Sequence, residues 1–280
     1  MCLEDFLKYF ISVSTCFIRS PQFKPWFERR FDDQWSLLND SVVDTTCTAV
    51  KPAHMYELSV CEAADVWAII YQSDAHLPGA SALVDQGILV VRIDGQEGTS
   101  MTEPRVVLDT TIQRHRQSNE TARLGPGRYI VLPYSSGTQQ KGQGQSVRPF
   151  HVAVLSDVAS TCHSLRALPF SLDLQQAALL SLVQARGSKD VLGKNDLLCL
   201  MQLRHGASHL YACSVNATAP SAYVVTLDSA ASSNVHTPHA VTAHARLLPP
   251  GGAAIFHHLT PINDKAPAAY NIDLAYKSKK

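Results

Sequence analysis

The sequence lacks a surplus of charge of either sign. Its 24 Lys and Arg side chains balance 24 Asp and Glu side chains. A general nucleic-acid binder needs a basic surplus to neutralise phosphates, so this balance argues against that class. No apolar run approaches the ~20 residues of a membrane-spanning helix. Glu4 and Asp5 also stand where a signal peptide would carry positive charge. We therefore expect an intracellular, cytoplasmic protein without a transmembrane segment.

Paired cysteines are also absent. The seven cysteines are an odd number, spread widely and without a CxxC pair, which indicates reduced thiols rather than a disulfide framework. They are Cys2, Cys16, Cys47, Cys61, Cys162, Cys199 and Cys213.

Nucleotide and hydrolase motifs are missing as well. GSKDVLGKN, residues 187–195, is the nearest match to a phosphate loop. Five residues separate its glycines instead of four, and Asn195 replaces the Ser or Thr that would bind magnesium. No GxGxxG motif opens a helix, and HGASHL has Leu210 where a GxSxG elbow needs its second glycine. We expect no bound cofactor.

Histidine is an abundant candidate metal ligand, with 12 residues in the chain. His236, His239 and His244 flank one predicted strand, and His257 and His258 are neighbours in another. Side chains alternate between the two faces of a strand, so His257 and His258 cannot both ligate one ion. Zinc needs about four converging ligands. The pattern therefore predicts solvent-facing strand histidines rather than a metal site.

Cysteine catalysis requires a thiolate whose pKa is lowered by a histidine, with an Asn or Asp orienting that histidine. No cysteine here follows the oxyanion-loop pattern of papain-like enzymes. Cys16 and Cys61 lie in strand-like runs, where a thiol usually serves as a small buried apolar group. The sequence thus predicts no catalytic, cofactor-binding or metal-binding residue.

The distribution of charge divides the chain in two. Residues 1–158 hold 14 basic and 18 acidic side chains, a net charge of 14 − 18 = −4. Residues 159–280 hold 10 basic and 6 acidic side chains, a net charge of 10 − 6 = +4. Two domains with different surfaces explain this split.

Residues 48–158 have a period of two. The runs HMYELSV, DVWAIIYQ, GILVVRI, PRVVLD, RYIVLPY and RPFHVAVLS are separated by turn signals such as LGPG. Evenly spaced strands without intervening helices predict an antiparallel β-sandwich and a mainly β protein.

The remaining segments frame this sandwich. Residues 1–47 precede it and contain a predicted amphipathic helix over 3–11, followed by the aromatic run PWFERRFDDQW. Residues 165–280 combine one helix, from an N-cap at Ser171 to a stop at Gly187, with strand-like runs, and predict a smaller α+β domain. We expect a protease-sensitive joint near 158–170, where small residues and a proline connect the two domains.

Several runs resemble the C-terminal part of calpain-family proteases. LEDFLKYFISVSTCFIR, residues 3–19, resembles the end of the calpain protease domain, and residues 124–157 resemble its C2-like β-sandwich, with Gly127, Tyr129, Pro133 and Phe150 matching. The residues from 170 onward resemble the C-terminal homology domain of small-optic-lobes calpains, by pattern more than by identity.

The resemblance implies a relative of a calcium-dependent cysteine endopeptidase, but none of the triad can be carried over. In calpains the catalytic Cys, His and Asn lie upstream of the LEDFLKYF helix, and no Asn-Pro-Trp occurs here. We expect a non-catalytic regulatory or interaction segment that is inactive alone. The alternative is the C-terminal half of a calcium-dependent cysteine endopeptidase whose catalytic residues lie upstream of this chain. The first reading implies a gene for a protease-less calpain relative, and the second implies a truncated gene model or an internal start at Met1.

The resemblance also bears on partners. In calpains the protease core would cover the apolar face formed by Leu3, Phe6, Leu7, Phe10 and Ile11. An open patch of this size is uncommon on a monomer. We expect residues 1–35 to fold back through Trp26, Phe27 and Trp35, to self-associate, or to bind a protease core. A membrane surface is a weaker candidate partner.

Overall fold

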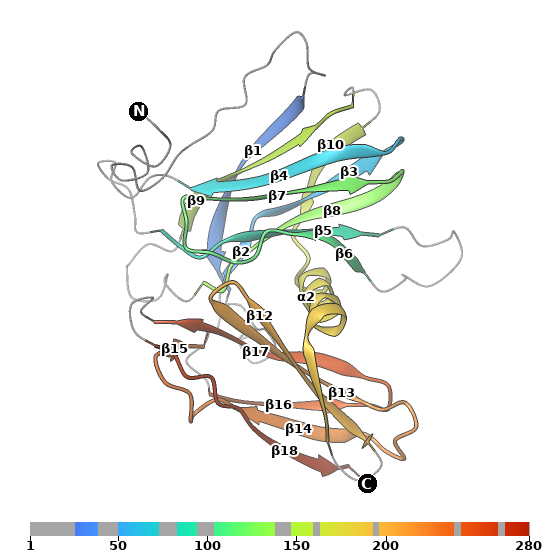
Figure 1. The fold of residues 1–280 in the computed structure, drawn as a ribbon, viewed down its shortest axis with the longest axis vertical. Coiled ribbons are helices and arrows are strands. Elements are labelled where there is room, and N and C mark those ends of the chain that lie inside the picture. The colour runs from blue at the N-terminus through green and yellow to red at the C-terminus, as the bar shows by residue number, and fades with distance from the viewer. Residues whose placement is uncertain are drawn as a thin grey trace, which may run out of the picture.

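A computed structural model of the chain describes residues 26–38, 50–72, 83–93, 104–137, 147–158, 163–192, 196–237, 242–262 and 267–279. Within these ranges the protein is mainly β, as predicted (Figure 1). The predicted helix over 3–11 lies outside the described residues.

The first half is a sandwich of two five-stranded antiparallel sheets. Sheet I has the order β2-β1-β9-β4-β7, and sheet II has the order β10-β3-β8-β5-β6. The strands are β1 (Phe27–Leu37), β2 (Val50–Pro52), β3 (His54–Val60), β4 (Ala64–Gln72), β5 (Gly87–Arg92), β6 (Arg105–Asp109), β7 (Gln117–Leu124), β8 (Gly127–Tyr134), β9 (Val147–Ser156) and β10 (His163–Pro169).

The alternation of side chains in the sequence corresponds to the buried and the outer face of sheet I. In β4, buried Val66, Ala68 and Ile70 alternate with partly exposed Trp67 and Ile69. The buried set joins apolar side chains of sheet II in the core of the first sandwich. Successive side chains on a strand point to opposite faces, which explains why this spacing builds a half-buried sheet.

The first sandwich extends beyond the predicted 48–158 at both ends. β1, which the sequence placed in the segment before the sandwich, pairs with β9 along its length, and buried Trp35 stacks on Phe150 at 4.4 Å. Trp26 packs edge-on against Trp67 at 6.4 Å. β10, predicted as part of the joint between the domains, pairs with β3 at the edge of sheet II. The sandwich therefore ends at Pro169.

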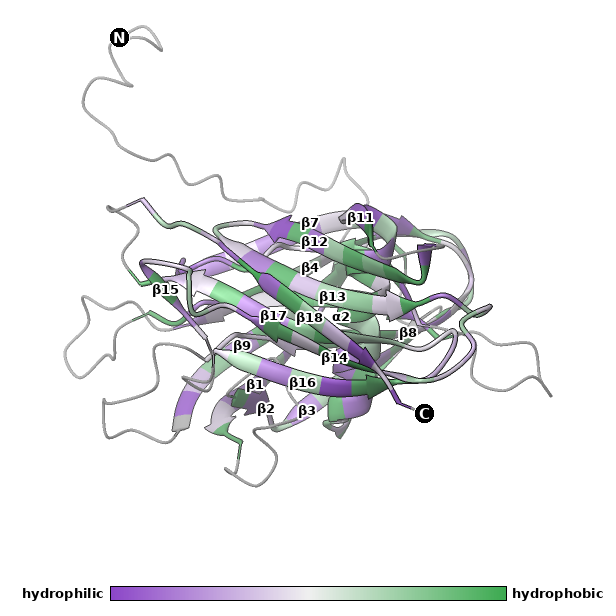
Figure 2. Ribbon diagram, turned by 90° about the horizontal axis from the view of Figure 1, so that it is seen from below, coloured by the Kyte–Doolittle hydropathy of each residue, from purple (hydrophilic) through white to green (hydrophobic). Residues whose placement is uncertain are grey.

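The second half contains two further sheets and a helix rather than a single sheet with a helix. Sheet III has the order β11-β12-β13-β17-β15, and sheet IV has the order β16-β14-β18. Their strands are β11 (Ser188–Leu192), β12 (Leu198–His205), β13 (Ser208–Val215), β14 (Tyr223–Asp228), β15 (Val235–His236), β16 (Ala243–Leu248), β17 (Ala253–Pro261) and β18 (Asp273–Ser278). Sheets III and IV enclose their own apolar core, so this half is a second, smaller sandwich. Figure 2 shows the strands of this half banded by hydropathy, as expected of sheets with one buried face.

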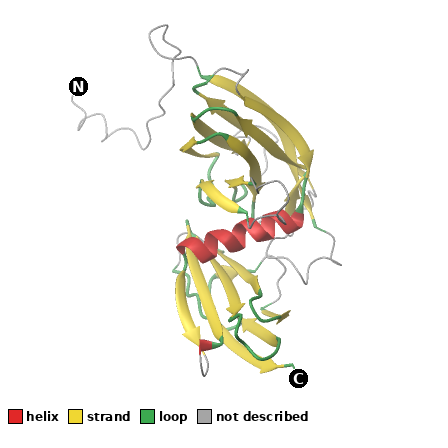
Figure 3. Ribbon diagram, turned by 90° about the vertical axis from the view of Figure 1, so that its right-hand side faces the viewer, coloured by secondary structure: helices red, strands yellow, loops and turns green. Residues whose placement is uncertain are grey.

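Helix α2 (Leu172–Arg186) starts and stops where the sequence predicts. The Ser171 hydroxyl accepts a hydrogen bond from the Leu174 backbone N–H, and Gly187 follows the last helical residue. The helix lies between the two sandwiches (Figure 3). Its buried Ala178, Leu179, Leu182 and Val183 face both sheet II and sheet III.

A third apolar core, called here the interface core, joins the two sandwiches through α2. Sheet II contributes Leu89, Val91, Ile130, Leu132 and Tyr134, and sheet III contributes Met201, Leu203, Leu210, Ala212 and Ile255. Sheet II is therefore buried on both faces, which explains why β5 and β8 are continuous apolar runs.

Candidate functional site at the junction of the two sandwiches

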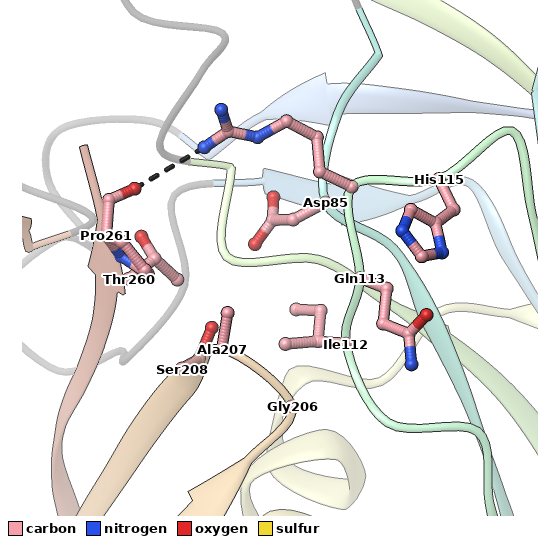
Figure 4. A pocket seen from close by; sticks show the side chains of 10 residues that line it. Asp85, Ile112, Gln113, His115, Gly206, Ala207, Ser208, Thr260 and Pro261 are labelled. Atoms are coloured by element: carbon pink, nitrogen blue, oxygen red, sulfur yellow. Dashed lines mark hydrogen bonds between the residues drawn. The ribbon is translucent and has the colours of Figure 1, made fainter. Parts of the chain in front are cut away.

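A cleft of about 410 Å³ opens where the two sandwiches meet (Figure 4). It is formed by the chain between β6 and β7, the turn between β12 and β13, and the end of β17. Its lining residues are Asp85, Ile112, Gln113, Arg114, His115, Gly206, Ala207, Ser208, Thr260 and Pro261.

Asp85 supplies a buried carboxylate to this cleft. One oxygen accepts a hydrogen bond from the Ser135 hydroxyl at 3.1 Å, and the other accepts one from the Ser136 backbone N–H at 3.2 Å. Burial raises the pKa of Asp85, although these hydrogen bonds and the charge of Arg114 oppose the shift. In Figure 4 the carboxylate of Asp85 points toward the side of the cleft formed by Thr260.

Two contacts cross the cleft. The guanidinium of Arg114, in the first sandwich, donates to the Pro261 carbonyl oxygen of β17 at 3.4 Å. Gly206 adopts a φ of 65°, and a Cβ built there would lie 2.5 Å from the Ile112 carbonyl oxygen. Only glycine allows the β12–β13 turn to approach the first sandwich this closely. The polar and backbone groups of the cleft thus hold the two halves together.

A buried polar cluster lies beside the cleft. Nε2 of His205, at the end of β12, is 2.7 Å and 2.8 Å from the two carboxylate oxygens of Asp109, at the end of β6. The Tyr134 hydroxyl lies 3.0 Å from Nδ1 of His205, and Arg186, at the end of α2, donates to Asp109 at 3.2 Å. The cluster is therefore formed where a strand of sheet II, a strand of sheet III and helix α2 end.

This cluster is built for cohesion rather than for catalysis. The side chains of His205 and Asp109 are 3% and 1% exposed, so a substrate in solvent does not reach them. Burial alone would raise the pKa of Asp109, but His205 and Arg186 outweigh it and hold the pKa below its usual value. Burial raises the pKa of Tyr134 well above its ordinary value, so its phenol stays protonated.

The prediction of solvent-facing histidines is wrong for three of the five. His244, His257 and His258 are buried, whereas His236 is exposed, and His239 lies outside the described residues. Nε2 of His257 lies 2.9 Å from the Leu227 carbonyl oxygen, and the His257 ring packs edge-on against His244 at 4.9 Å. For His257 and His258, sequence alternation cannot reveal this burial, because sheet III has an apolar core on each of its faces. His244 lies in β16 of sheet IV, and its ring packs against His257 of sheet III.

Two of the three described cysteines, Cys199 and Cys213, do not have the environment of nucleophiles. Burial raises the pKa of Cys199, and it raises the pKa of Cys213 to about 12. A catalytic thiol requires the opposite shift. The prediction that Cys61 is a buried apolar group in a strand is wrong, because Cys61 is exposed and lies directly after the end of β3. The other four cysteines lie outside the described residues.

Sequence reasoning missed Asp109, His205, Tyr134, Arg186 and Asp85. The cluster joins residues far apart in the chain, with 96 positions between Asp109 and His205, so no local motif marks it. The one available signal was that each of these polar residues lies next to an apolar run.

Comparison with known proteins adds no assignment: no family model matches the chain, and no curated protein matches it. Across the described ranges, no three His, Cys, Asp or Glu side chains are grouped so as to hold a metal ion. The same ranges contain no helix with both the length and the apolarity needed to cross a membrane.

Proposed function

We propose that the chain is a non-catalytic regulatory and interaction segment of a calpain-like cysteine protease. In this proposal the first sandwich is of the C2-like calpain type, and the second half corresponds to the small-optic-lobes homology domain. Its task is to bind a protein partner, in the first place a calpain-type protease core, rather than to cleave peptide bonds.

The placement of β8 and β9 carries this proposal. The run that resembles the calpain-type sandwich, residues 124–157, contains both strands. β8 is the central strand of sheet II and β9 is the central strand of sheet I. The residues with the most specific resemblance therefore build the middle of both facing sheets, and Tyr129 and Phe150 are buried in the core between them.

The thiols support the non-catalytic part of the proposal. Cys213 and Cys199 each contact a backbone carbonyl, of Ser214 and Leu200, and the pKa of each thiol is raised. A raised pKa leaves little thiolate at neutral pH, so neither side chain is prepared to attack a peptide carbonyl.

An activity assay tests this first part. The purified full chain is incubated with casein and calcium, beside the variants Cys61→Ala, Cys199→Ala and Cys213→Ala. We expect no hydrolysis above buffer from any of the four proteins. Thiol-sensitive turnover that one of these substitutions abolishes would overturn the proposal.

A binding assay tests the partner. The full chain is immobilised, and an isolated calpain-type protease core is passed over it, with papain as a control protease without a sandwich partner. We expect saturable binding of the calpain core alone. Equal retention of papain, or no retention of the calpain core, would contradict the proposed partner.

A further inference from the structure

His257 and His258 are adjacent in β17 but belong to different cores. His258 is opposite Leu210, a residue of the interface core, whereas His257 is opposite Tyr211, a residue of the core of the second sandwich. Because neighbouring strand residues face opposite ways, His257 points between sheets III and IV. His258 points toward sheet II and α2.

His258 has an environment that suits only its neutral form. Its side chain is fully buried, and neither ring nitrogen has a hydrogen-bond partner among the residues that the structure describes. Burial lowers the pKa of His258 to about 3, and the electrostatic effect of His205 acts in the same direction.

The acidic group of this region is already engaged. Asp109 accepts hydrogen bonds from His205 and Arg186, and no hydrogen bond joins it to His258. The charged and titratable groups at this end of the interface include Arg114 and His115 between β6 and β7 and Asp85 before β5. They also include His205 on β12, Asp109 on β6, Tyr134 on β8 and Arg186 on α2. Among the described residues of the closed interface, no hydrogen-bond acceptor therefore faces a proton on His258.

We propose that the junction of the two sandwiches is an acid-sensitive latch: protonation of His258 drives sheet III away from sheet II and α2, while each sandwich stays folded. The geometry selects this motion. Water reaches His258 when the interface core separates, whereas opening the core between sheets III and IV exposes the other face of β17. This inference rests on the interface and not on the proposed calpain relationship.

The size of the effect follows from linkage between protonation and opening. An exposed histidine titrates near 6.5, so the open form gains a proton at a pH at which closed His258 stays neutral. Between pH 7 and pH 5 the ratio of open to closed molecules is expected to rise by about 25-fold.

Amide hydrogen exchange of the full chain at pH 7 and pH 5, corrected for the intrinsic rate of each amide, measures this ratio. We expect exchange in α2 and β12 to rise by about 25-fold at pH 5, with no comparable rise in β4 and β9 of the first sandwich. His258→Phe is expected to abolish the rise. His257→Phe, the matched control on the other face of β17, is expected to retain it.

The comparison is made as a ratio between the two pH values within each variant, so that a general loss of stability cancels. His258→Leu provides a smaller replacement in case phenylalanine does not fit. Equal exchange at both pH values in the wild type would overturn the latch. An undiminished rise in the His258 variants, or a uniform rise through β4, β9 and α2 together, would overturn it as well.

Discussion

A hydrogen-bonded ion pair joins the two sandwiches: Nε2 of His205 lies 2.7 Å from a carboxylate oxygen of Asp109, and both side chains are almost fully buried. Asp109 ends β6 of sheet II, and His205 ends β12 of sheet III. Both groups have lost water on folding, so each depends on the other for compensation. The pair, with Arg186 from α2, fixes how the two sandwiches meet at their polar end.

Removing one partner of this pair is expected to be costly. Asp109→Ala leaves His205 and Arg186 without their acceptor, and breaking a buried pair typically costs about 3–5 kcal/mol of the free energy of unfolding. Arg123→Ala is the control, because the Arg123–Asp65 pair is 62% and 49% exposed and such pairs contribute about 0–1 kcal/mol. Urea denaturation measures both. Equal losses in the two variants would contradict the assigned role of Asp109.

The sequence was informative wherever one face of an element is buried. The alternation in β4 predicts a half-buried strand, and the Ser171 cap and Gly187 stop predict the limits of α2. The sequence is less informative about which elements cover a sheet that is buried on both faces. The continuous apolar runs of β5 and β8 record burial on both faces, but they do not reveal what covers the second face.

The junction could not be predicted for a related reason. Asp85, Asp109 and His205 come together because three sheets and a helix end at one place, and each residue alone resembles an ordinary polar residue beside a strand. Trp26 and Trp35 pack on Trp67 and Phe150, as the first of the alternatives for residues 1–35 predicts. β1, which contains most of the aromatic run at 26–35, pairs with β9 more than 100 positions away, and no local sequence pattern indicates that partner.

A substitution at Trp35 tests whether β1 belongs to the first sandwich. Trp35 is fully buried and stacks on Phe150, so Trp35→Ala removes a large ring from the core and leaves a cavity. Such truncations cost about 3–5 kcal/mol. Trp26→Ala, at a partly exposed ring, is expected to cost much less. Urea midpoints compare the two variants; a Trp35→Ala protein as stable as Trp26→Ala would remove β1 from the core.

His257 makes stability fall on the acid side of neutrality. Burial, opposed in part by the hydrogen bond to Leu227, lowers the pKa of His257 to about 4, below the value near 6.5 in an unfolded chain. As the pH falls through 6.5, the unfolded state takes up the proton first, so the folded state is destabilised. Above about pH 7 this protonation does not lower the free energy of unfolding, and at pH 5 it lowers it by about 2 kcal/mol.

The test is the pH dependence of the free energy of unfolding for the wild type and for His257→Leu. We expect the variant to be less stable at pH 7, because the Leu227 carbonyl loses its partner, but to have a curve that is flatter by about 2 kcal/mol between pH 7 and pH 5. Parallel curves would show that His257 is not the titrating group.

Two glycines with similar backbones separate the effect of strain from that of close approach. Gly206 and Gly251 have φ values of 65° and 74°, so an alanine at either position costs about 1–2 kcal/mol in backbone strain. A Cβ at Gly251 would lie no closer than 3.7 Å to its nearest neighbour, whereas a Cβ at Gly206 would lie 2.5 Å from the Ile112 carbonyl oxygen of the first sandwich. We therefore expect Gly206→Ala to lose more stability than Gly251→Ala in urea denaturation, and to increase amide exchange in α2 and β12 because the β12–β13 turn must withdraw from the cleft. Equal losses in the two variants, with α2 still protected, would mean that the turn does not hold the two sandwiches together.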